Sequence, residues 1–209
     1  EDMAGYLDGK GKPMLYLADF GDNSRKRDDL TIYRVREPAL PKGLLSKAPE
    51  SVFNGATEPA DAFPFKYPDG HHDAEALFVD RKTERPYIIT KSMTASGGVY
   101  RFPLPLRTQE EVTLEKVRGS AAERISKLLL VTGAASSPDG NRVVVMTYFS
   151  AYEMIRAKGS FESIFDSELT PIRLPLQRQG EAISYTLDGK SIVTTGEQIP
   201  APIYKLTRK

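Results

Sequence analysis

Short apolar runs separated by polar residues recur along the whole chain. Each run is rich in Val, Ile, Leu and Tyr and is bounded by glycine, proline or Asp-Gly. Runs of this length and composition predict β-strands, and alternation between apolar and polar positions predicts strands with one face in a core. The four clearest runs are MLYLAD (14–19), PYIITK (86–91), RVVVMTY (142–148) and SIVTTGE (191–197).

Each of these runs is the middle strand of a predicted three-stranded unit. A first strand precedes it across a turn, and Asp-Gly in three of the four turns is a strong hairpin signal. The first strands begin EDMA (1–4), EALF (75–78), AASS (134–137) and EAIS (181–184). The third strands, each with a basic residue between apolar ones, are TIYRV (31–35), GVYRF (98–102), PIRL (171–174) and PIYKL (202–206).

Antiparallel units repeated in this way are typical of β-propeller blades. The units start at residues 1, 75, 134 and 181, and the unequal intervals of 74, 59 and 47 residues indicate variable loops. We therefore predict an all-β protein with a single β-propeller domain over 1–209. Its four visible blades are 1–61, 62–118, 119–177 and 178–209.

Three further segments complete the predicted elements. Fourth, outer strands are expected in AFPFKYP (62–68) and EVTLEKV (111–117). The segment 151–169 carries apolar residues at roughly helical spacing until Gly159 interrupts them. This spacing predicts one short helical insertion between blades.

Composition and charge exclude several classes of protein. The 209 residues include 29 basic and 28 acidic side chains, a balance that does not favour a nucleic-acid surface. The absence of cysteine excludes disulfides, thiolate nucleophiles and zinc-finger sites. No apolar run approaches the roughly 20 residues of a membrane span. The sequence therefore predicts neither a nucleic-acid partner nor a membrane span.

Seven motifs follow one another along nearly the whole chain: EDMA, YLADFGDN, IYRVREP, YPDGHHDAEALFVD, VTGAASSPDG, SAYE and QGEAISYTLDG. In this order they resemble a largely uncharacterised bacterial family of propeller-like proteins that are mostly exported. The resemblance implies a β-propeller fold and an extracytoplasmic location, either periplasmic or secreted. The wider set of related propellers includes gluconolactonase-like and phytase-like enzymes, which bind divalent cations at the channel mouth.

Four blades are few for a propeller, which normally closes by pairing its first and last strands to remove exposed edges. Glu1 already lies inside a repeat motif. Members of the resembling family usually carry a tryptophan just before the first Glu-Asp and a further repeat upstream, and this chain shows neither. We expect five or six blades when complete, with a missing N-terminal segment or a second chain closing the propeller.

Hairpin geometry predicts where the repeated acids meet. In an antiparallel hairpin, the start of the first strand lies beside the end of the second. The expected neighbours are Glu1 with Asp19, Glu75 with Lys91, and Glu181 with Glu197. Because the innermost strands converge on the propeller axis, these pairs should form a ring at one mouth of the channel. The third repeat places Ala134 opposite Thr147 and Tyr148, and we expect a gap there through which a ligand enters.

Clustered acids repel one another unless a positive charge neutralises them, and Lys91 can neutralise one of them. Carboxylate and amide oxygens are the ligands that Ca²⁺ and Mg²⁺ prefer. We therefore predict a calcium-like (or magnesium) site at the mouth, with candidate ligands Glu1, Glu75, Glu181, Asp22 and Asn23. The structural alternative is that strand-initial glutamates accept backbone N–H groups and fix the packing of the blades.

Two further groups of residues are candidates for chemistry. His72 and Asp73, just before Glu75, could act as a general base near neutral pH. The alternative for the histidine is to cap the turn YPDG. Tyr148 and Tyr152 could stack on a sugar or lactone ring, although core packing is the commoner role of such residues. The full set of candidate ligand-binding residues is Asp19, Lys91, Tyr148, Tyr152 and Glu197.

Two functions fit these observations. The first is a non-catalytic extracytoplasmic binding or scaffold domain for an unknown small molecule or protein. The alternative is a metal-assisted hydrolase of a small ester, lactone or phosphoester, in which the cation polarises the substrate or activates water. The lack of a nucleophile motif favours the first. Convergence of the acids on one solvent-filled cavity would favour the second.

Overall fold

The structure of the chain, a computed structural model, describes residues 1–39 and 54–208. The described strands form four sheets, and apart from β8 each sheet is built from strands that follow one another along the chain. The first sheet has the strand order β1 (Met3–Leu7), β2 (Pro13–Asp19), β3 (Thr31–Arg36), β4 (Asp61–Lys66) and β8 (Val112–Thr113). Its strands are antiparallel except β8, which pairs with β4 in parallel.

The other three sheets are antiparallel throughout. The second contains β5 (Ala74–Asp80), β6 (Arg85–Thr90), β7 (Val99–Arg101) and β9 (Glu115–Lys116). The third contains β10 (Val131–Ser136), β11 (Arg142–Thr147), β12 (Ala151–Ile155) and β13 (Thr170–Ile172). The fourth contains β14 (Gly180–Tyr185), β15 (Ser191–Gly196) and β16 (Tyr204–Thr207).

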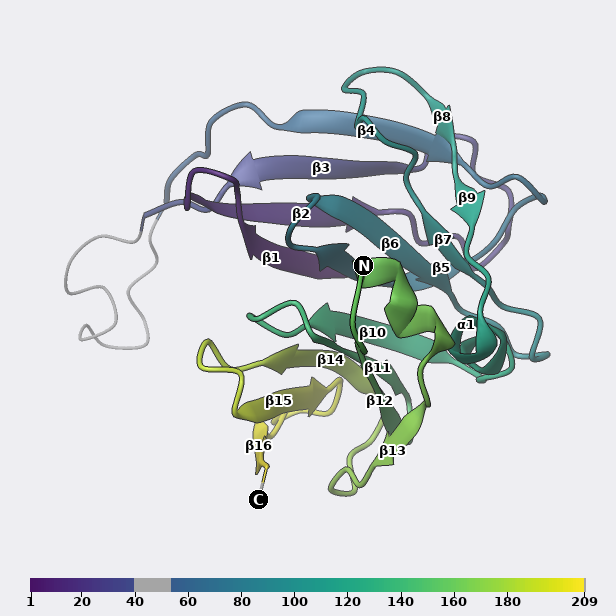
Figure 1. The fold of residues 1–209 in the computed structure, drawn as a ribbon, viewed down its shortest axis with the longest axis vertical. Helices are drawn as coiled ribbons and strands as arrows, with labels where there is room; N and C mark the ends of the chain where they lie inside the picture. The colour runs from purple at the N-terminus through teal and green to yellow at the C-terminus, as the bar shows by residue number, and fades with distance from the viewer. Residues whose placement is uncertain (40–53, 209) are drawn as a thin grey trace.

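The innermost strands of the four sheets lie side by side in chain order. Strand β1 packs against β5, β5 against β10, and β10 against β14. Figure 1 shows the first sheet at the top of the view, the second below it, and the third and fourth in the lower half. The arrangement is that of four blades of a β-propeller, which confirms the predicted fold class.

The core lies between the blades. One apolar cluster joins the first and second sheets, a second joins the second and third sheets, and a smaller third joins the third and fourth. In β11, Val143 and Val145 face the second of these clusters, whereas Val144 and Met146 face the third. Because side chains alternate between the two faces of a strand, a strand buried on both sides needs an unbroken apolar run such as VVVM.

Two short helical segments cover the interface between the second and third blades. Helix α1 spans Ser120–Ile125, and the 3₁₀ helix η2 spans Phe161–Asp166. The two segments contact each other and bury Ile125, Ile164 and Phe165 in the same apolar cluster. None of the helices in the described ranges has the length and apolar character needed to cross a membrane.

The predicted helical insertion over 151–169 is wrong in its first part. Residues 151–155 form strand β12, and η2 alone is helical within that segment. The helical spacing was overridden because β12 pairs along its whole length with β11 and places Met154 in the core. As a result, the PIRL segment supplies β13 as the fourth strand of its sheet and not the third.

The predicted outer strands occupy both sheets of the first half of the chain. The AFPFKYP segment forms β4 in the first sheet, which therefore extends to Lys66, beyond residue 61. The EVTLEKV segment divides into β8, which pairs with β4, and β9, which pairs with β7. The Asp-Gly turns lie between paired strands as predicted, with Gly140 and Gly189 at positive φ, a conformation that glycine adopts without strain.

The first sheet is packed on one face among the described residues. Ala4 and Tyr6 of β1 are buried against the second blade, while Met3 and Leu7 are 56% and 55% exposed. Leu17 lies opposite Met3 in the β1–β2 pairing and is also exposed. The outward face of this sheet is therefore apolar and open.

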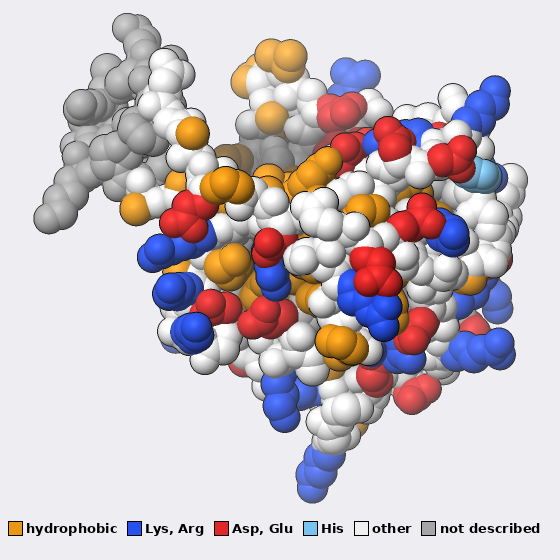
Figure 2. Space-filling view, turned by 90° about the horizontal axis from the view of Figure 1, so that it is seen from above, with side chains coloured by type: hydrophobic (Ala, Val, Ile, Leu, Met, Phe, Trp, Pro, Cys, Tyr) orange, Lys and Arg blue, Asp and Glu red, His pale blue; other side chains and the backbone are white. Residues whose placement is uncertain are grey.

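Several surface arginines form local ion pairs. Arg34 of β3 lies 2.7 Å from Asp61 and 3.6 Å from Glu84 of the neighbouring sheet, so it bridges two blades. Arg101 of β7 likewise pairs with Glu115 at 2.8 Å. Figure 2 shows acidic and basic side chains interspersed over the face seen from above. This face therefore carries no extended field of one sign.

Ile88 tests the packing between the first two blades, because its side chain is fully buried in the cluster that joins them. We expect Ile88→Ala to lower the free energy of unfolding by about 2–5 kcal/mol through lost burial and a residual cavity. Urea titrations measure this change. Leu187→Ala, at a position 97% exposed in a turn, is the control and should stay within about 0.5 kcal/mol. Equal effects of the two substitutions would contradict the packing described.

Candidate functional site

A β-bulge at the start of the innermost strand recurs in three blades. The pairing register shifts between Ala74 and Ala76, between Val131 and Gly133, and between Gly180 and Ala182. Glu75, Thr132 and Glu181 are the residues inserted at these shifts and so occupy equivalent positions. A bulge turns the inserted residue out of the regular ladder, and such sites often re-aim a side chain.

The predicted alignment of the third repeat is therefore wrong by two residues. Ala134 pairs with Val145 inside the β10–β11 ladder, and it does not lie opposite Thr147 and Tyr148. The equivalent of the acids is Thr132, whose hydroxyl donates a 2.6 Å hydrogen bond to the Gly180 carbonyl of the next blade. The third blade thus contributes a neutral residue to this set of equivalent positions, which we call the mouth, and it leaves no gap at Ala134.

In the first blade Asp2, not Glu1, stands at the position of the acids. The Glu1 nitrogen donates to the Ala18 carbonyl, and the Ala18 N–H donates to the Asp2 carbonyl, so Glu1 and Asp2 share one partner residue. The sequence analysis missed Asp2, because a one-residue bulge leaves no mark in a pattern of strand letters.

The Asp2 carboxylate ties three blades together. It accepts hydrogen bonds from the N–H groups of Met3 at 2.8 Å, Leu77 at 2.8 Å and Ala134 at 3.4 Å. Burial raises the pKa of Asp2 to about 7, although the three N–H donors favour the ionised form. Asp2 therefore plays the structural role that the sequence analysis considered for the strand-initial acids.

Glu75 and Lys91 form a largely buried ion pair at the mouth. The Lys91 Nζ lies 2.6 Å from Glu75 Oε1 and also donates to the Tyr148 hydroxyl at 2.9 Å. Burial raises the pKa of Glu75 despite the favourable charge of Lys91. Burial opposes the charge of Lys91 too, but Glu75 and Tyr148 hold the pKa of the lysine above its ordinary value. We take the pair as ionised, because one charge buried without the other would be far less stable.

One oxygen of this pair is left without a partner. Glu75 Oε2 is buried and accepts no hydrogen bond from the residues that the structure describes. A buried carboxylate oxygen without a donor is destabilising, so it favours a bound donor or cation.

Glu181 is the acid of the mouth whose charge is least supported. Burial raises its pKa to about 7, and the negative charges of Glu75, Glu197 and Glu1 add to the effect, while Lys91 opposes it. Glu197 follows β15 and is exposed, and its N–H donates to the Gln179 carbonyl at 3.2 Å. Glu181 therefore changes charge close to neutral pH.

The remaining predicted ligands lie beside the mouth in other contacts. Asp19 forms a 2.9 Å ion pair with Arg27. The Asp22 carboxylate accepts the Arg27 N–H at 2.9 Å, and the Asp22 N–H donates to Asp73 Oδ1 at 2.9 Å. Asn23 is exposed.

Glu1 lies with its carboxylate against Gly21, where a side chain would collide with it. No three acidic or histidine side chains of residues 1–39 and 54–208 are grouped closely enough to hold a metal ion. As they stand, the proposed ligands do not form a coordination shell, and calcium binding stays a prediction.

His72 and Asp73 form hydrogen bonds with residues other than the mouth acids. His72 Nε2 lies 2.9 Å from Asp69 Oδ1, within a network in which Tyr100 and Lys116 also bond to Asp69. Asp73 is buried and accepts the N–H of Asp22. His72 is therefore part of a turn network, as in the alternative considered from the sequence.

The two tyrosines do not form a stacking pair. Tyr148 lies at the mouth, where Lys91 Nζ is 4.8 Å from the centre of its ring. Tyr152 is on β12 and packs against the cluster between the second and third blades. The structure thus brings together Glu75, Lys91 and Tyr148, with Glu181 and Glu197 at electrostatic range.

Comparison with known proteins gives matches among solved structures alone. No family model and no curated protein matches the chain. A chain of a nidogen/laminin complex is 9% identical, with TM-score 0.52, and the match covers 93% of this chain and 57% of that one. A luciferin-regenerating enzyme is 10% identical, with TM-score 0.52, and the match covers 99% of this chain and 61% of that one. The periplasmic gluconolactonase of Pseudomonas aeruginosa is 11% identical, with TM-score 0.50, and the match covers 98% of this chain and 56% of that one.

These matches support the fold and nothing finer. The chain is a β-propeller by its own sheets and by these neighbours. It spans less than two thirds of the length of each of the three chains. The presence of a gluconolactonase among them agrees with the resemblance found in the sequence.

The raised pKa of Glu181 predicts a pH dependence of stability. Its folded pKa of about 7 lies above the ordinary value of 4.5, so the folded chain binds this proton more tightly than the unfolded chain does. The contribution to stability is full below about pH 4.5 and is lost as the pH rises through about 7. We expect Glu181→Gln to remove part of the fall in unfolding free energy over that window, measured by urea titration at each pH.

Glu168→Gln is the matched control, because it removes an exposed glutamate outside the mouth. A pH profile of Glu181→Gln identical to that of the control would contradict the electrostatics of the mouth.

Proposed function

We propose that this chain is the ligand-binding part of an extracytoplasmic β-propeller, whose acidic mouth binds a positively charged group. The proposal rests on one observation: the mouth holds more negative charge than its own residues neutralise. One carboxylate oxygen of Glu75 pairs with Lys91, and the other oxygen is buried without a hydrogen-bond donor. Glu181 has no such partner and is driven toward protonation instead.

A cation would relieve both problems at once. It would supply a partner for the free Glu75 oxygen, and it would favour the ionised form of Glu181, since an opposite charge within about 4–6 Å lowers a carboxyl pKa. Glu197 and Glu1 are exposed nearby and could join through small side-chain movements. Ca²⁺ is a suitable probe, because it accepts carboxylate oxygens in flexible geometry.

An extracytoplasmic location is part of this proposal. The resemblance to an exported family supports it, as does the presence of a periplasmic protein among the similar folds. An all-β chain without cysteine is compatible with export but does not require it.

Calcium titration tests the charge argument. We expect millimolar CaCl₂ to raise the melting temperature of the protein by a few degrees at about pH 8, where Glu181 is ionised, and by much less at about pH 5. Glu181→Gln should lose most of the shift at the higher pH, because it lacks the charge that the ion would neutralise. Scanning calorimetry provides the measurement.

Glu168→Gln serves again as the control and should keep the shift seen in the unsubstituted protein. If all three proteins respond equally at both pH values, calcium binds elsewhere or not at all, and the charge argument fails.

The alternative function is a hydrolase, and one observation favours it. A carboxyl group with a pKa of about 7 is tuned to take up and release protons at neutral pH, which is what a general acid or base requires. Tyr148 and Lys91 beside it could orient a substrate oxygen through their polar hydrogens. The described mouth contains no paired nucleophile and base, so any hydrolysis would use water as the nucleophile.

Assays with a small lactone, an aryl ester and an aryl phosphate distinguish the two functions. A hydrolase should show a kcat/KM profile with an inflection near pH 7 and a loss of roughly 10²–10⁴-fold in Glu181→Gln. A binding domain should hydrolyse none of the three substrates faster than the uncatalysed background rate. Turnover that survives Glu181→Gln would rule out this acid as the catalytic group.

A further inference from the structure

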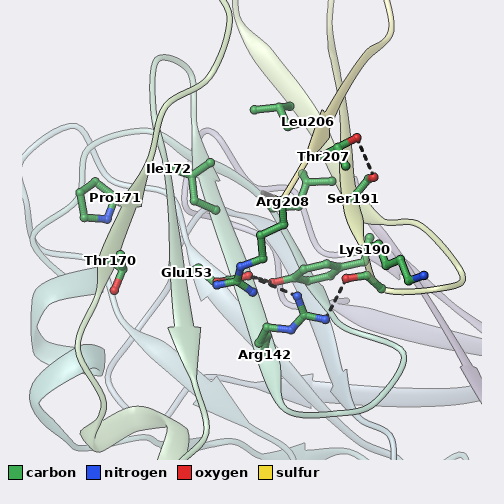
Figure 3. Close-up of a pocket in the computed structure, with 13 residues that line it drawn as sticks. Arg142, Glu153, Thr170, Pro171, Ile172, Lys190, Ser191, Leu206, Thr207 and Arg208 are labelled. Carbon is green, nitrogen blue, oxygen red and sulfur yellow. Dashed lines mark hydrogen bonds and ion pairs between the residues drawn. The ribbon is translucent and has the colours of Figure 1, made fainter.

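A second site lies between the third and fourth blades, at the end of β11 away from the mouth. It is a cavity of about 300 Å³, bounded by β11 to β13 on one side and by β15 and β16 on the other. Arg142 begins β11 at this end, whereas Tyr148 follows the other end of the strand at the mouth. Figure 3 shows Arg142, Glu153 and Arg208 converging in it, with Ile172 and Leu206 on its walls.

The one acid of the cavity lining is already satisfied within the protein. Glu153 is buried, with 5% of its surface exposed. Its Oε1 accepts the Tyr185 hydroxyl at 2.9 Å, and its Oε2 accepts Arg208 Nη2 at 2.7 Å. Both carboxylate oxygens are therefore engaged, and the acid offers little to a cationic ligand.

The basic side chains of the cavity have hydrogen-bonding capacity to spare. An arginine carries five N–H donors in a planar fork. Arg142 donates to the Gly189 carbonyl at 2.9 Å and lies 5.1 Å from the centre of the Tyr185 ring, and Arg208 donates to Glu153. Lys190 adds a third positive charge at the edge. Arg142 also lies 4.0 Å from Glu153 and 3.9 Å from Asp139, so ion pairs offset part of the positive charge. The cavity keeps the guanidinium N–H donors that these contacts leave unused.

The rest of the lining is largely apolar. Ile172 of β13, Ile192 of β15 and Leu206 of β16 form its walls, together with Pro171. A volume of about 300 Å³ is at the lower end of the range for ligand pockets. The site thus combines a planar cationic end with an apolar body of small size.

We propose that this cavity binds a small organic carboxylate. The carboxylate would lie on the free N–H groups of Arg142 and Arg208, since guanidinium and carboxylate match as planar two-point partners. The carbon body of the ligand would contact Ile172, Ile192 and Leu206. Because the cavity is built from two blades, the ligand would bridge the third and fourth sheets.

Isothermal titration with 3-phenylpropanoate tests the proposal on the whole chain. The matched probes are 3-phenylpropanamide, which keeps the shape and lacks the charge, and 3-phenylpropylamine, which reverses it. We expect the acid to bind with a Kd in the millimolar range or below, and the amide at least about tenfold more weakly. The amine should show no binding. In spectra of ¹⁵N-labelled protein, the acid should shift the backbone amides of Gly189 and Lys190.

Substitutions then locate the binding. Arg208→Gln keeps a hydrogen-bond donor for Glu153 and removes the positive charge. We expect this variant to bind 3-phenylpropanoate at least about fivefold more weakly. Lys205→Gln on the same strand is the control; its side chain is exposed outside the lining, and binding should be unchanged. Equal binding of acid and amide, or no binding at about 10 mM acid, would overturn the proposal, and neither result requires a variant to fold.

Discussion

The innermost strand of every propeller blade has one backbone edge with no strand beside it, and this constraint governs the structure. The polar groups of these edges need hydrogen-bond partners, because an unpaired buried N–H or carbonyl group is destabilising. Side chains from neighbouring blades do this. The Asp2 carboxylate accepts the N–H groups of Leu77 and Ala134, and the hydroxyls of Thr132 and Ser136 donate to the carbonyls of Gly180 and Val79. Blade order is thus fixed by polar bonds as well as by apolar area.

The same constraint explains why acids gather at the mouth and why they differ. A bulge places Glu75, Thr132 and Glu181 at equivalent positions, and Asp2 stands at the corresponding position of the first blade. Asp2 reaches free N–H groups and becomes structural, and Glu75 reaches Lys91 and becomes half of a buried pair. Glu181 finds neither, so burial decides its pKa. One repeated position therefore yields two acids that bond to neighbouring groups and one acid without such a partner, according to what lies within reach.

The sequence predicted the fold because hairpins and alternation are local signals. The four middle strands and the Asp-Gly turns lie where their patterns placed them, and the Glu75–Lys91 contact follows from hairpin pairing alone. The bulges could not be read, since an inserted residue changes neither composition nor spacing visibly. That is why Glu1 and Ala134 were aligned in place of Asp2 and Thr132. Strand β12 was missed because pairing with β11 overrode its helical spacing.

The third blade departs from the acidic pattern at the mouth, and its other end is joined to the fourth blade by polar contacts. At the mouth, Thr132 replaces an acid and Tyr148 supplies a neutral oxygen to Lys91, which limits the repulsion that Glu181 already feels. At the other end, Glu153 is bound by residues of the fourth blade. The apolar interface between these two blades is the smallest of the three. Polar contacts, and a ligand held by them, would therefore contribute most to stability at this interface, where apolar burial contributes least.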